Sequence, residues 1–321
     1  MALFQAAAAK NADGEKQPDR ARGTRRVLPL AACALQSAMA APMLRLYPGP
    51  PQQAAVEGAY LSHALHRLGN AARPFVYADF VSSLDGRIAL DEPGGESRLP
   101  PALRSANDLR LLLELMAQAD CLITHGGYLR AIAAGRLDDI LQVGARAGSE
   151  DLARWRKASG LAPQPAVAIA SASLDFPLPP SLAQHGQPVM VATGAGAPAD
   201  KVAALRAHGC EVFVAGQGRY VEGRPLTREL GARGFRSLFL LAGPRMLETM
   251  LRDRILARLY LTMVHCVLGG AAFHTLIAGP ELGPAGRLKL SALHYDAVQP
   301  EGAGQWFAQF EAPRADGAGE E

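Results

Sequence analysis

The sequence has little cysteine and no strong excess of charge of either sign. Its four cysteines, Cys33, Cys121, Cys210 and Cys266, stand alone, without the C-x-x-C spacing of a zinc knuckle or a dithiol redox centre. Isolated thiols in apolar runs behave as small buried hydrophobic groups, so we expect a reducing, cytoplasmic compartment. The chain carries 33 basic and 30 acidic side chains, a balance that argues against a nucleic acid or a membrane as partner.

Several catalytic motifs are missing as well. The sequence contains neither the G-x-S-x-G nucleophile turn nor the H-E-x-x-H zinc motif, and the zinc-deaminase pair H-x-E and P-C-x-x-C is absent too. We therefore expect no metal site. The phosphate-binding patterns G-x-G-x-x-G and the P-loop are also missing. What remains is chemistry that a bound cofactor performs while the protein binds and orients it.

The two ends of the chain are predicted to lie outside the folded domain. Residues 1–42 show no helix or strand periodicity and are predicted to be a disordered leader, with Met43 as the start of the organised protein. An alternative is a secretory signal, because a basic pair precedes the apolar run 27–35, although this run is far shorter than the ~20 residues of a membrane span. Residues 43–72 are predicted to be a helical extension, because apolar side chains recur at helical spacing over 56–68. Residues 312–321 are predicted to be a disordered tail.

Residues 73–311 have the alternating pattern of an α/β domain. The first strand is predicted over 75–81, and Ser105 is placed to cap a helix that begins beside Asp108. Nearly continuous apolar runs between the later helices indicate a largely parallel sheet buried on both faces. The last part, 287–311, alternates instead and predicts an antiparallel hairpin at the edge of the sheet. The later strands are predicted at 121–124, 167–170, 189–192, 212–215, 237–241 and 259–267.

Three loops combine a strand end with glycine. They are 124–127, 241–245 and 268–270. Glycine lets the backbone approach a ligand, and a helix start attracts phosphate through its free N–H groups and its dipole. Ligands of parallel sheets bind at the carboxyl ends of the strands, so these loops predict a dinucleotide site. Each loop taken alone is equally consistent with a tight turn made for packing.

The order of the motifs carries a resemblance to a known family. Five segments, together with the Asn107-Asp108 helix start, occur in the order and spacing of the C-terminal reductase domain of the bacterial bifunctional riboflavin-biosynthesis deaminase/reductase. These segments are 73–76, 83–87, 119–123, 242–244 and 268–270. The resemblance implies a dihydrofolate-reductase-like three-layer fold and NADPH-dependent reduction of a small molecule, a ribosylamino-pyrimidine. It also implies a homodimer.

The resemblance and the three loops together supply the candidate site residues. Asp79 on the first strand and Asp85 in the turn expected beside the nicotinamide are the catalytic candidates. Ser97 is predicted to bind substrate, and Arg98 and Arg130 are candidates for holding a substrate phosphate, with a solvated surface arginine as the alternative for each. The cofactor-binding candidates are Leu99, Thr124, Gly126, Gly127, Ser171, Gly243, Pro244, Arg245, Met246 and Gly269.

The chain departs from the family pattern where that family contacts its substrate. Asp79 stands where the family has lysine, Met116 where it has arginine, and Leu241 where it has glutamate. Asp79 is expected either to bind a heterocycle or carry a proton, or to be an outward-facing residue of a half-exposed strand. The departures leave three alternatives open: a reductase of another, pterin-like substrate, an NADP(H)-binding regulatory protein without turnover, or a scaffold in which the dimer surface matters.

Overall fold

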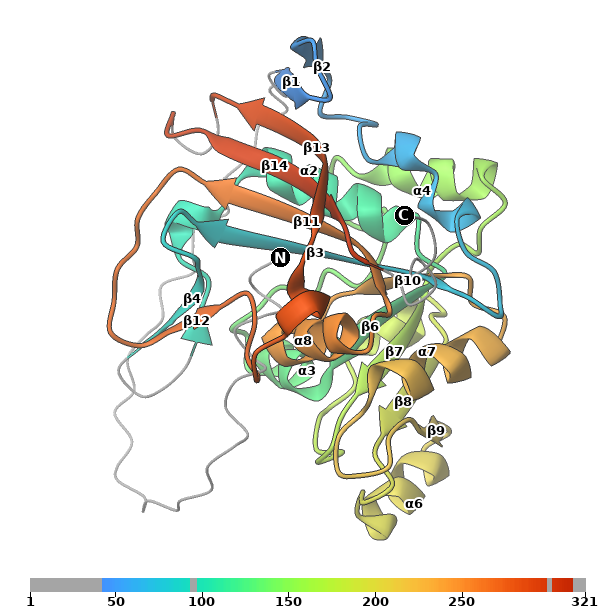
Figure 1. Ribbon diagram of the computed structural model, residues 1–321. Helices are drawn as coiled ribbons and strands as arrows, with labels where there is room; N and C mark the ends of the chain where they lie inside the picture. The colour runs from blue at the N-terminus through green and yellow to red at the C-terminus, as the bar shows by residue number, and fades with distance from the viewer. Residues whose placement is uncertain (1–41, 93–96, 299–301, 314–321) are drawn as a thin grey trace, which may run out of the picture.

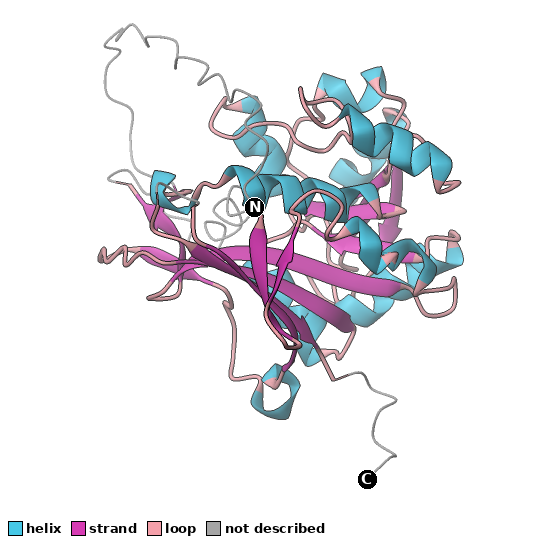
Figure 2. Ribbon diagram, turned by 90° about the horizontal axis from the view of Figure 1, so that it is seen from above, coloured by secondary structure: helices cyan, strands magenta, loops and turns pink. Residues whose placement is uncertain are grey.

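The computed structural model describes residues 42–92, 97–298 and 302–313, and the predictions for the leader and most of the tail lie outside this part. Within it, a single sheet of eleven strands runs in the order β2-β1-β13-β14-β11-β3-β10-β6-β7-β8-β9. Figure 1 shows this sheet crossing the molecule, and Figure 2 shows helices on both of its faces, which gives three layers.

The parallel part of the sheet runs from β11 to β9. Its strands are rich in branched and aromatic residues with both faces covered, as the apolar runs predict. The strand bounds are β3 Phe75–Ser83, β6 Cys121–His125, β7 Ala166–Ala170, β8 Val189–Thr193, β9 Glu211–Val214, β10 Ser237–Leu240 and β11 Leu256–Val264. The helix bounds are α2 Ala106–Ala117, α3 Gly126–Ala133, α4 Glu150–Ala158, α5 Pro180–Gln184, α6 Ala199–Ala207, α7 Gly223–Ala232 and α8 Pro244–Arg252. Ser105 caps α2 as predicted, because its side chain accepts the Asp108 N–H.

The antiparallel part of the sheet is larger than predicted. Strands β13 (Lys289–Asp296) and β14 (Gln305–Glu311) form the expected antiparallel hairpin, and β14 pairs with β11. The hairpin is not the edge of the sheet, however, because β1 (Met43–Tyr47) pairs with β13 and β2 (Gln52–Ala54) pairs with β1. Figure 1 shows these two strands at the top, beyond β13. The segment before residue 73 therefore belongs to the same sheet as the rest of the domain.

The helix predicted over 56–68 is wrong. Two short 3-10 helices, η1 (Leu61–His63) and η2 (Leu65–Arg67), occupy this segment and are separated by Ala64. Ala64 and Gly58 both have left-handed backbones, with φ of 49° and 79°, which interrupt an α-helix. The segment is fixed to α2 by side chains: Glu114 accepts the N–H groups of Gly58 and Tyr60 at 2.6 and 2.9 Å. The apolar residues of this segment pack against α2 from an irregular backbone rather than from a helix.

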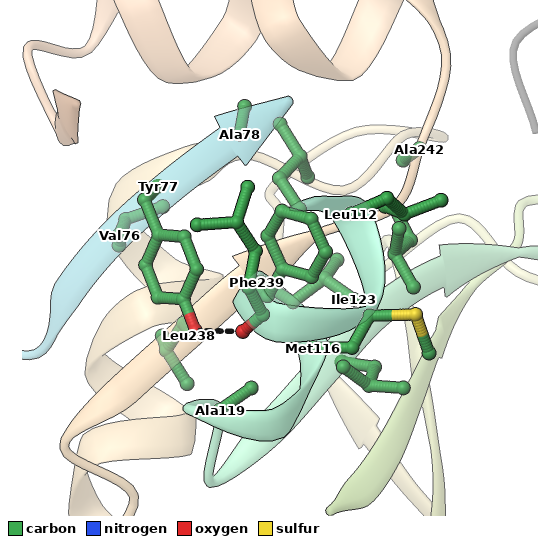
Figure 3. Packing of buried hydrophobic residues seen from close by; sticks show 14 of the residues in the cluster. Val76, Tyr77, Ala78, Leu112, Met116, Ala119, Ile123, Leu238, Phe239 and Ala242 are labelled. Carbon is green, nitrogen blue, oxygen red and sulfur yellow. Dashed lines mark hydrogen bonds between the residues drawn. The ribbon is translucent and has the colours of Figure 1, made fainter. Parts of the chain in front are cut away.

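The main core lies between α2 and the middle of the sheet. Figure 3 shows Tyr77 and Phe239 from neighbouring strands packed together, with Met116 and Leu112 of α2 nearby. The two rings stack with centroids 5.0 Å apart, and the Tyr77 hydroxyl donates a hydrogen bond to the Leu115 carbonyl at 2.9 Å. Burial of aromatic rings and a satisfied hydroxyl together fix α2 on the sheet.

A second, smaller sheet stands beside the carboxyl end of β3. Its three strands are β12 (Phe273–Thr275), β4 (Arg87–Asp91) and β5 (Ser97–Arg98), in that order, and the sequence analysis did not predict them. Figure 1 shows β4 and β12 below the end of β3. These strands are short and interrupted by turns, so the sequence carries only a weak alternation for them.

Candidate functional site at the carboxyl edge of the sheet

The three glycine loops lie on one edge of the sheet. Gly126 follows β6, Gly243 follows β10 and Gly269 follows β11, and the strands from β11 through β3 and β10 to β6 are all parallel. Their carboxyl ends therefore point the same way. The Leu241 N–H donates to the Ile123 carbonyl at 2.8 Å, which joins the end of β10 to the end of β6. The loops are arranged as a ligand-binding edge of a parallel sheet requires.

The start of α3 brings two predicted cofactor residues into contact. A Cβ atom added at Gly126 would lie 3.2 Å from the Ser171 hydroxyl oxygen and 2.8 Å from the Phe176 ring, so a larger residue there would force these side chains to move. Gly127 is the next residue of α3 and is half-buried. His125 caps the helix, because its Nδ1 accepts the Tyr128 N–H at 3.3 Å. The loop after β6 and the loop after β7 therefore form one surface.

Two buried hydroxyls on this edge have no protein partner within the described ranges. Thr124 is the last residue but one of β6 and Thr193 is the last residue of β8, and the Oγ1 atom of each is buried without a hydrogen bond. Such an orphaned group costs about 1–3 kcal/mol unless a ligand or water satisfies it. Thr124 was predicted from the sequence and Thr193 was missed. The signal for Thr193 is similar to that for Thr124, a threonine at the end of an apolar strand with a glycine one or two residues later.

The start of α8 opens into a pocket. Gly243 caps the helix with an extended backbone, Pro244 is its first residue, and Met246 packs half-buried against the core. Arg245 is exposed and lines a pocket of about 520 Å³ together with Arg219, Thr249 and Arg252.

Cations outnumber free anions in this pocket. Glu248 is paired with Arg252 at 2.7 Å, and the Glu222 carboxylate accepts the Gln217 N–H at 2.7 Å. Over the part of the chain that the structure describes, Arg219 and Arg245 have no carboxylate partner. Two unpaired guanidinium groups suit a phosphate. Arg219 was missed because it follows β9 in a loop whose fold back onto α8 has no sequence signal.

Asp85 links the β3–β4 turn to the loop after β11. Its carboxylate accepts the Ser83 hydroxyl and the N–H groups of Gly269 and Leu268 at 2.9 and 3.3 Å, and it pairs with Arg87 at 2.6 Å. These bonds, the one from Ser83 foremost, lower the pKa of Asp85 to about 2. Asp85 is therefore ionised at neutral pH. It positions the glycine loop and has no proton to donate.

Asp79 is buried, so the expectation of an outward-facing residue on a half-exposed strand is wrong. It lies in the middle of β3 and is 3% exposed. The buried carboxyl of Asp108, on α2, is its charged neighbour: burial first, and then the charge of Asp108, raise the pKa of Asp79 well above its usual value. Burial also raises the pKa of Asp108, against a hydrogen bond from Thr262. The sequence of a strand does not tell how completely a helix will cover it.

The predicted substrate-side residues lie on separate elements. Ser97, on β5, bonds to Asp91 and lies 2.8 Å from Nε2 of His274. Arg98 pairs with Glu92 at 2.8 Å on the surface, and Arg130, on α3, donates to the Asp175 carbonyl at 2.6 Å. The structure thus gives both arginines protein partners and does not bring them together. Leu99, which follows Arg98 in the sequence and was predicted to contact the cofactor, is buried in the core.

His265 and His274 are polar residues of this region that sequence reasoning did not select. His265 directly follows β11 and lies 4.4 Å from the Trp306 ring, and its Nε2 atom is buried without a partner in the described residues. His274 lies on β12, and its Nε2 is 2.9 Å from Asp91. The contact between β12 and β5 joins residues far apart in the chain, so neither spacing nor periodicity indicated it.

The described residues contain no cluster of three or more histidine, cysteine, aspartate or glutamate side chains suited to a metal ion. None of the helices in these ranges has the length and apolar character needed to cross a membrane.

Comparisons with known proteins agree with this architecture. Among solved structures, the chain is similar to a pyrimidine reductase-like protein from Corynebacterium diphtheriae NCTC, with a TM-score of 0.59 and 20% identity over 81% of this chain and 97% of that one. It is also similar to RibD from Acinetobacter baumannii, with a TM-score of 0.52 and 18% identity over 75% of this chain and 58% of that one. A comparison with curated proteins gives no match.

At these identities the solved structures establish the fold, which is the three-layer α/β arrangement around a largely parallel sheet expected from the sequence. The family follows from a separate match. A family model described as the RibD C-terminal domain matches residues 74–300, which is most of the 321-residue chain. The chain therefore belongs to the RibD C-terminal domain family.

Proposed function

We propose that the protein is a nicotinamide-dependent reductase that uses NADPH to reduce a ribosylamino-pyrimidine or a related small heterocycle. The observation that carries the proposal is the convergence of the loops of Gly126, Gly243 and Gly269 on one sheet edge, beside a pocket with two unpaired arginines. Membership of the RibD C-terminal domain family supports it, as does similarity to a structure described as pyrimidine reductase-like.

The residues on this edge fit a phosphorylated dinucleotide. Backbone N–H groups at the starts of α3 and α8 suit the pyrophosphate, and the buried hydroxyl of Thr124 and the hydroxyl of Ser171 are polar groups beside them. Arg245 and Arg219 suit a further phosphate, which distinguishes NADPH from NADH. When bound, NADPH supplies the hydride. The protein binds and orients, and Asp85 fixes the Gly269 loop against the turn after β3.

The substrate class is proposed from the family resemblance. Polar side chains on the small sheet favour a heterocyclic substrate. Ser97, Asp91 and His274 form a polar cluster that offers both donors and acceptors to a heterocycle edge. Asp79 replaces the family's lysine in a buried position, so a substrate other than the riboflavin-pathway pyrimidine, such as a pterin, is the second candidate. We also propose a homodimer, which light scattering of the purified protein tests.

The test is titration of the protein with NADPH and with NADH, followed by fluorescence or calorimetry. We expect Arg245→Gln to weaken NADPH binding by about tenfold, because it removes a charge-assisted hydrogen bond to phosphate worth about 1.5–3 kcal/mol, and to change NADH binding less. Arg228→Gln is the matched control, since it removes an exposed arginine of α7 outside the pocket.

Two results would change the proposal. If NADPH does not bind at millimolar concentration, the protein is not an NADPH-dependent reductase. Saturable NADPH binding without oxidation, over a panel of ribosylamino-pyrimidines and pterins, replaces the reductase with a regulatory protein that binds the cofactor.

A further inference from the structure

We infer that the protein has a second ligand site, for a small organic anion, between the N-terminal hairpin and β13. A pocket of about 300 Å³ is lined there by β1, β2, η1 and β13. Most of its lining precedes residue 74, where the match to the family model begins, so membership of the family does not account for it. None of the residues of the carboxyl-edge loops lines it.

Arg45 supplies the cation of this pocket. It lies on β1 opposite Gln52 of β2 and His294 of β13, and its Nη2 atom donates to the Gln52 side chain at 2.8 Å. Its Nε atom is buried and has no partner within the residues that the structure describes. A buried N–H of a guanidinium group is costly when unpaired, and a carboxylate or phosphate oxygen is the partner that its fork geometry fits best.

Two imidazole rings face the same space. His63 lies with Nδ1 at 2.8 Å from the Tyr260 hydroxyl, and His294 lines the pocket beside Arg45. Burial, then the charges of Arg258 and His294, lower the pKa of His63 to about 4. Burial and the charge of Arg45 also lower the pKa of His294. Both rings are therefore neutral at pH 7 and available as N–H donors.

The described residues that line the pocket include no carboxylate, and Arg45 is the charged side chain among them. Two carboxylates behind the lining are engaged: Glu114 accepts the Tyr60 N–H at 2.9 Å and pairs with Arg110, and Glu311 pairs with Arg258 at 2.7 Å. An anion that enters the pocket therefore meets attraction from Arg45 and donors from both histidines.

The size and walls of the pocket limit what it takes. About 300 Å³ is at the lower end of the range for ligand pockets, which suits a metabolite-sized anion and excludes a dinucleotide. One wall is aromatic, with the Tyr60 ring 4.6 Å from the Tyr260 ring and 5.3 Å from His63. Met43 and Ala292 add apolar surface. The fitting ligand has one carboxylate or phosphate monoester group on a short, partly apolar body.

The experiment titrates the full chain with inorganic phosphate and, separately, with sodium benzoate, at ionic strength held constant with sodium chloride. The readout is the ring ¹⁵N signals of His63 and His294 by NMR. We expect saturable shifts of both rings with one or both probes, and binding at least tenfold weaker in Arg45→Gln. Arg224→Gln, which removes an exposed arginine of α7 outside the pocket, is expected to bind as the wild type does.

Shifts that grow linearly without saturation, or that are equal in Arg45→Gln and Arg224→Gln, overturn the inference. If circular dichroism shows that Arg45→Gln does not fold, His294→Gln replaces it with the same expected tenfold loss. Saturation by phosphate alone assigns a phosphate monoester, and saturation by benzoate alone assigns a carboxylate. NADPH binding is expected to be unchanged in Arg45→Gln, so failure of this site and failure of the cofactor site are distinguishable.

Discussion

Asp79 and Asp85 are close in sequence, yet their environments move their pKa values in opposite directions. The Asp85 carboxylate accepts hydrogen bonds from the Ser83 hydroxyl and from two backbone N–H groups, and it forms an ion pair with Arg87. These contacts stabilise its charge. Asp79 lies under α2 beside a second carboxyl, where burial and the like charge of Asp108 oppose ionisation. Asp85 therefore acts as a charged anchor, while Asp79 and Asp108 favour a protonated state.

The position of Asp79 predicts a pH-dependent stability. Because its folded pKa lies above the unfolded value, its contribution to stability is fully present below about pH 4 and is lost as pH rises through the folded pKa. Asp79→Asn does not ionise. We expect this variant to be more stable than wild type at pH 7 by about 1 kcal/mol or more, with the difference vanishing near pH 4.

Urea unfolding at several pH values between 4 and 7 measures this. Asp200→Asn, an exposed aspartate of α6, is the control and should change the free energy of unfolding by less than about 0.5 kcal/mol. A drop in turnover of tenfold or more in Asp79→Asn, with NADPH binding intact, would instead give Asp79 a part in proton transfer.

At the residue scale, the sequence indicated positions at strand ends more readily than side chains that meet only through the small sheet. Gly126, Ser171 and Gly243 follow strand ends, and a strand end can be recognised from the apolar run before it. Ser97 and His274 meet only through the small sheet, which depends on pairing between distant short strands. No local pattern in the sequence contains that information.

At the scale of elements, one buried carboxylate holds the segment between β2 and β3 in its position against α2. Glu114 is fully buried on α2, accepts the N–H groups of Gly58, Tyr60 and Leu61, and pairs with Arg110 at 2.9 Å. Burial raises the pKa of Glu114 although these bonds oppose the shift. The segment has no continuous helix of its own, so these contacts determine where it lies.

Removing this carboxylate should loosen the segment. Glu114→Ala leaves three N–H groups without their acceptor and leaves Arg110 with Asp151 alone, and we expect a loss of about 3 kcal/mol in the free energy of unfolding. Amide hydrogen exchange over residues 56–68 should also become faster. Glu229→Ala, which breaks the more exposed helix pair with Arg233, should cost less than about 1 kcal/mol. Unchanged protection of residues 56–68 in Glu114→Ala would contradict this account.

The elements also show which structures apolar patterns predict correctly and which they do not. The parallel strands from β3 to β10 were predicted within two residues of their observed bounds, because a strand covered on both faces has a nearly continuous apolar run. Apolar spacing gave a wrong helix over 56–68, where left-handed residues at Gly58 and Ala64 prevent one. Only the contacts with α2 make that backbone favourable.

At the scale of the whole molecule, the order of the strands in the sheet determines which parts of the chain are needed for folding. The family match ends at residue 300, but β14 begins at Gln305 and lies between β11 and β13. A chain that ends at residue 300 should therefore fail to fold cooperatively, because removing β14 separates β1, β2 and β13 from the remaining strands.

Circular dichroism and thermal unfolding of this truncated chain, with the full chain as control, provide the measurement. A cooperative transition within a few degrees of the full chain would show that β14 is dispensable. The sequence predicted the hairpin but not its central place, since the partners of β13 come from the opposite end of the chain.

This strand order also has a consequence for synthesis on the ribosome. The first described strand, β1, is made early but pairs with β13, and β13 joins β11 only through β14, which is made after every other described strand. Until β14 has been made, β11 presents an unpaired and largely apolar edge. A nascent chain that has completed β11 but not β14 therefore has an open strand edge, which is the feature that favours aggregation of partly made domains.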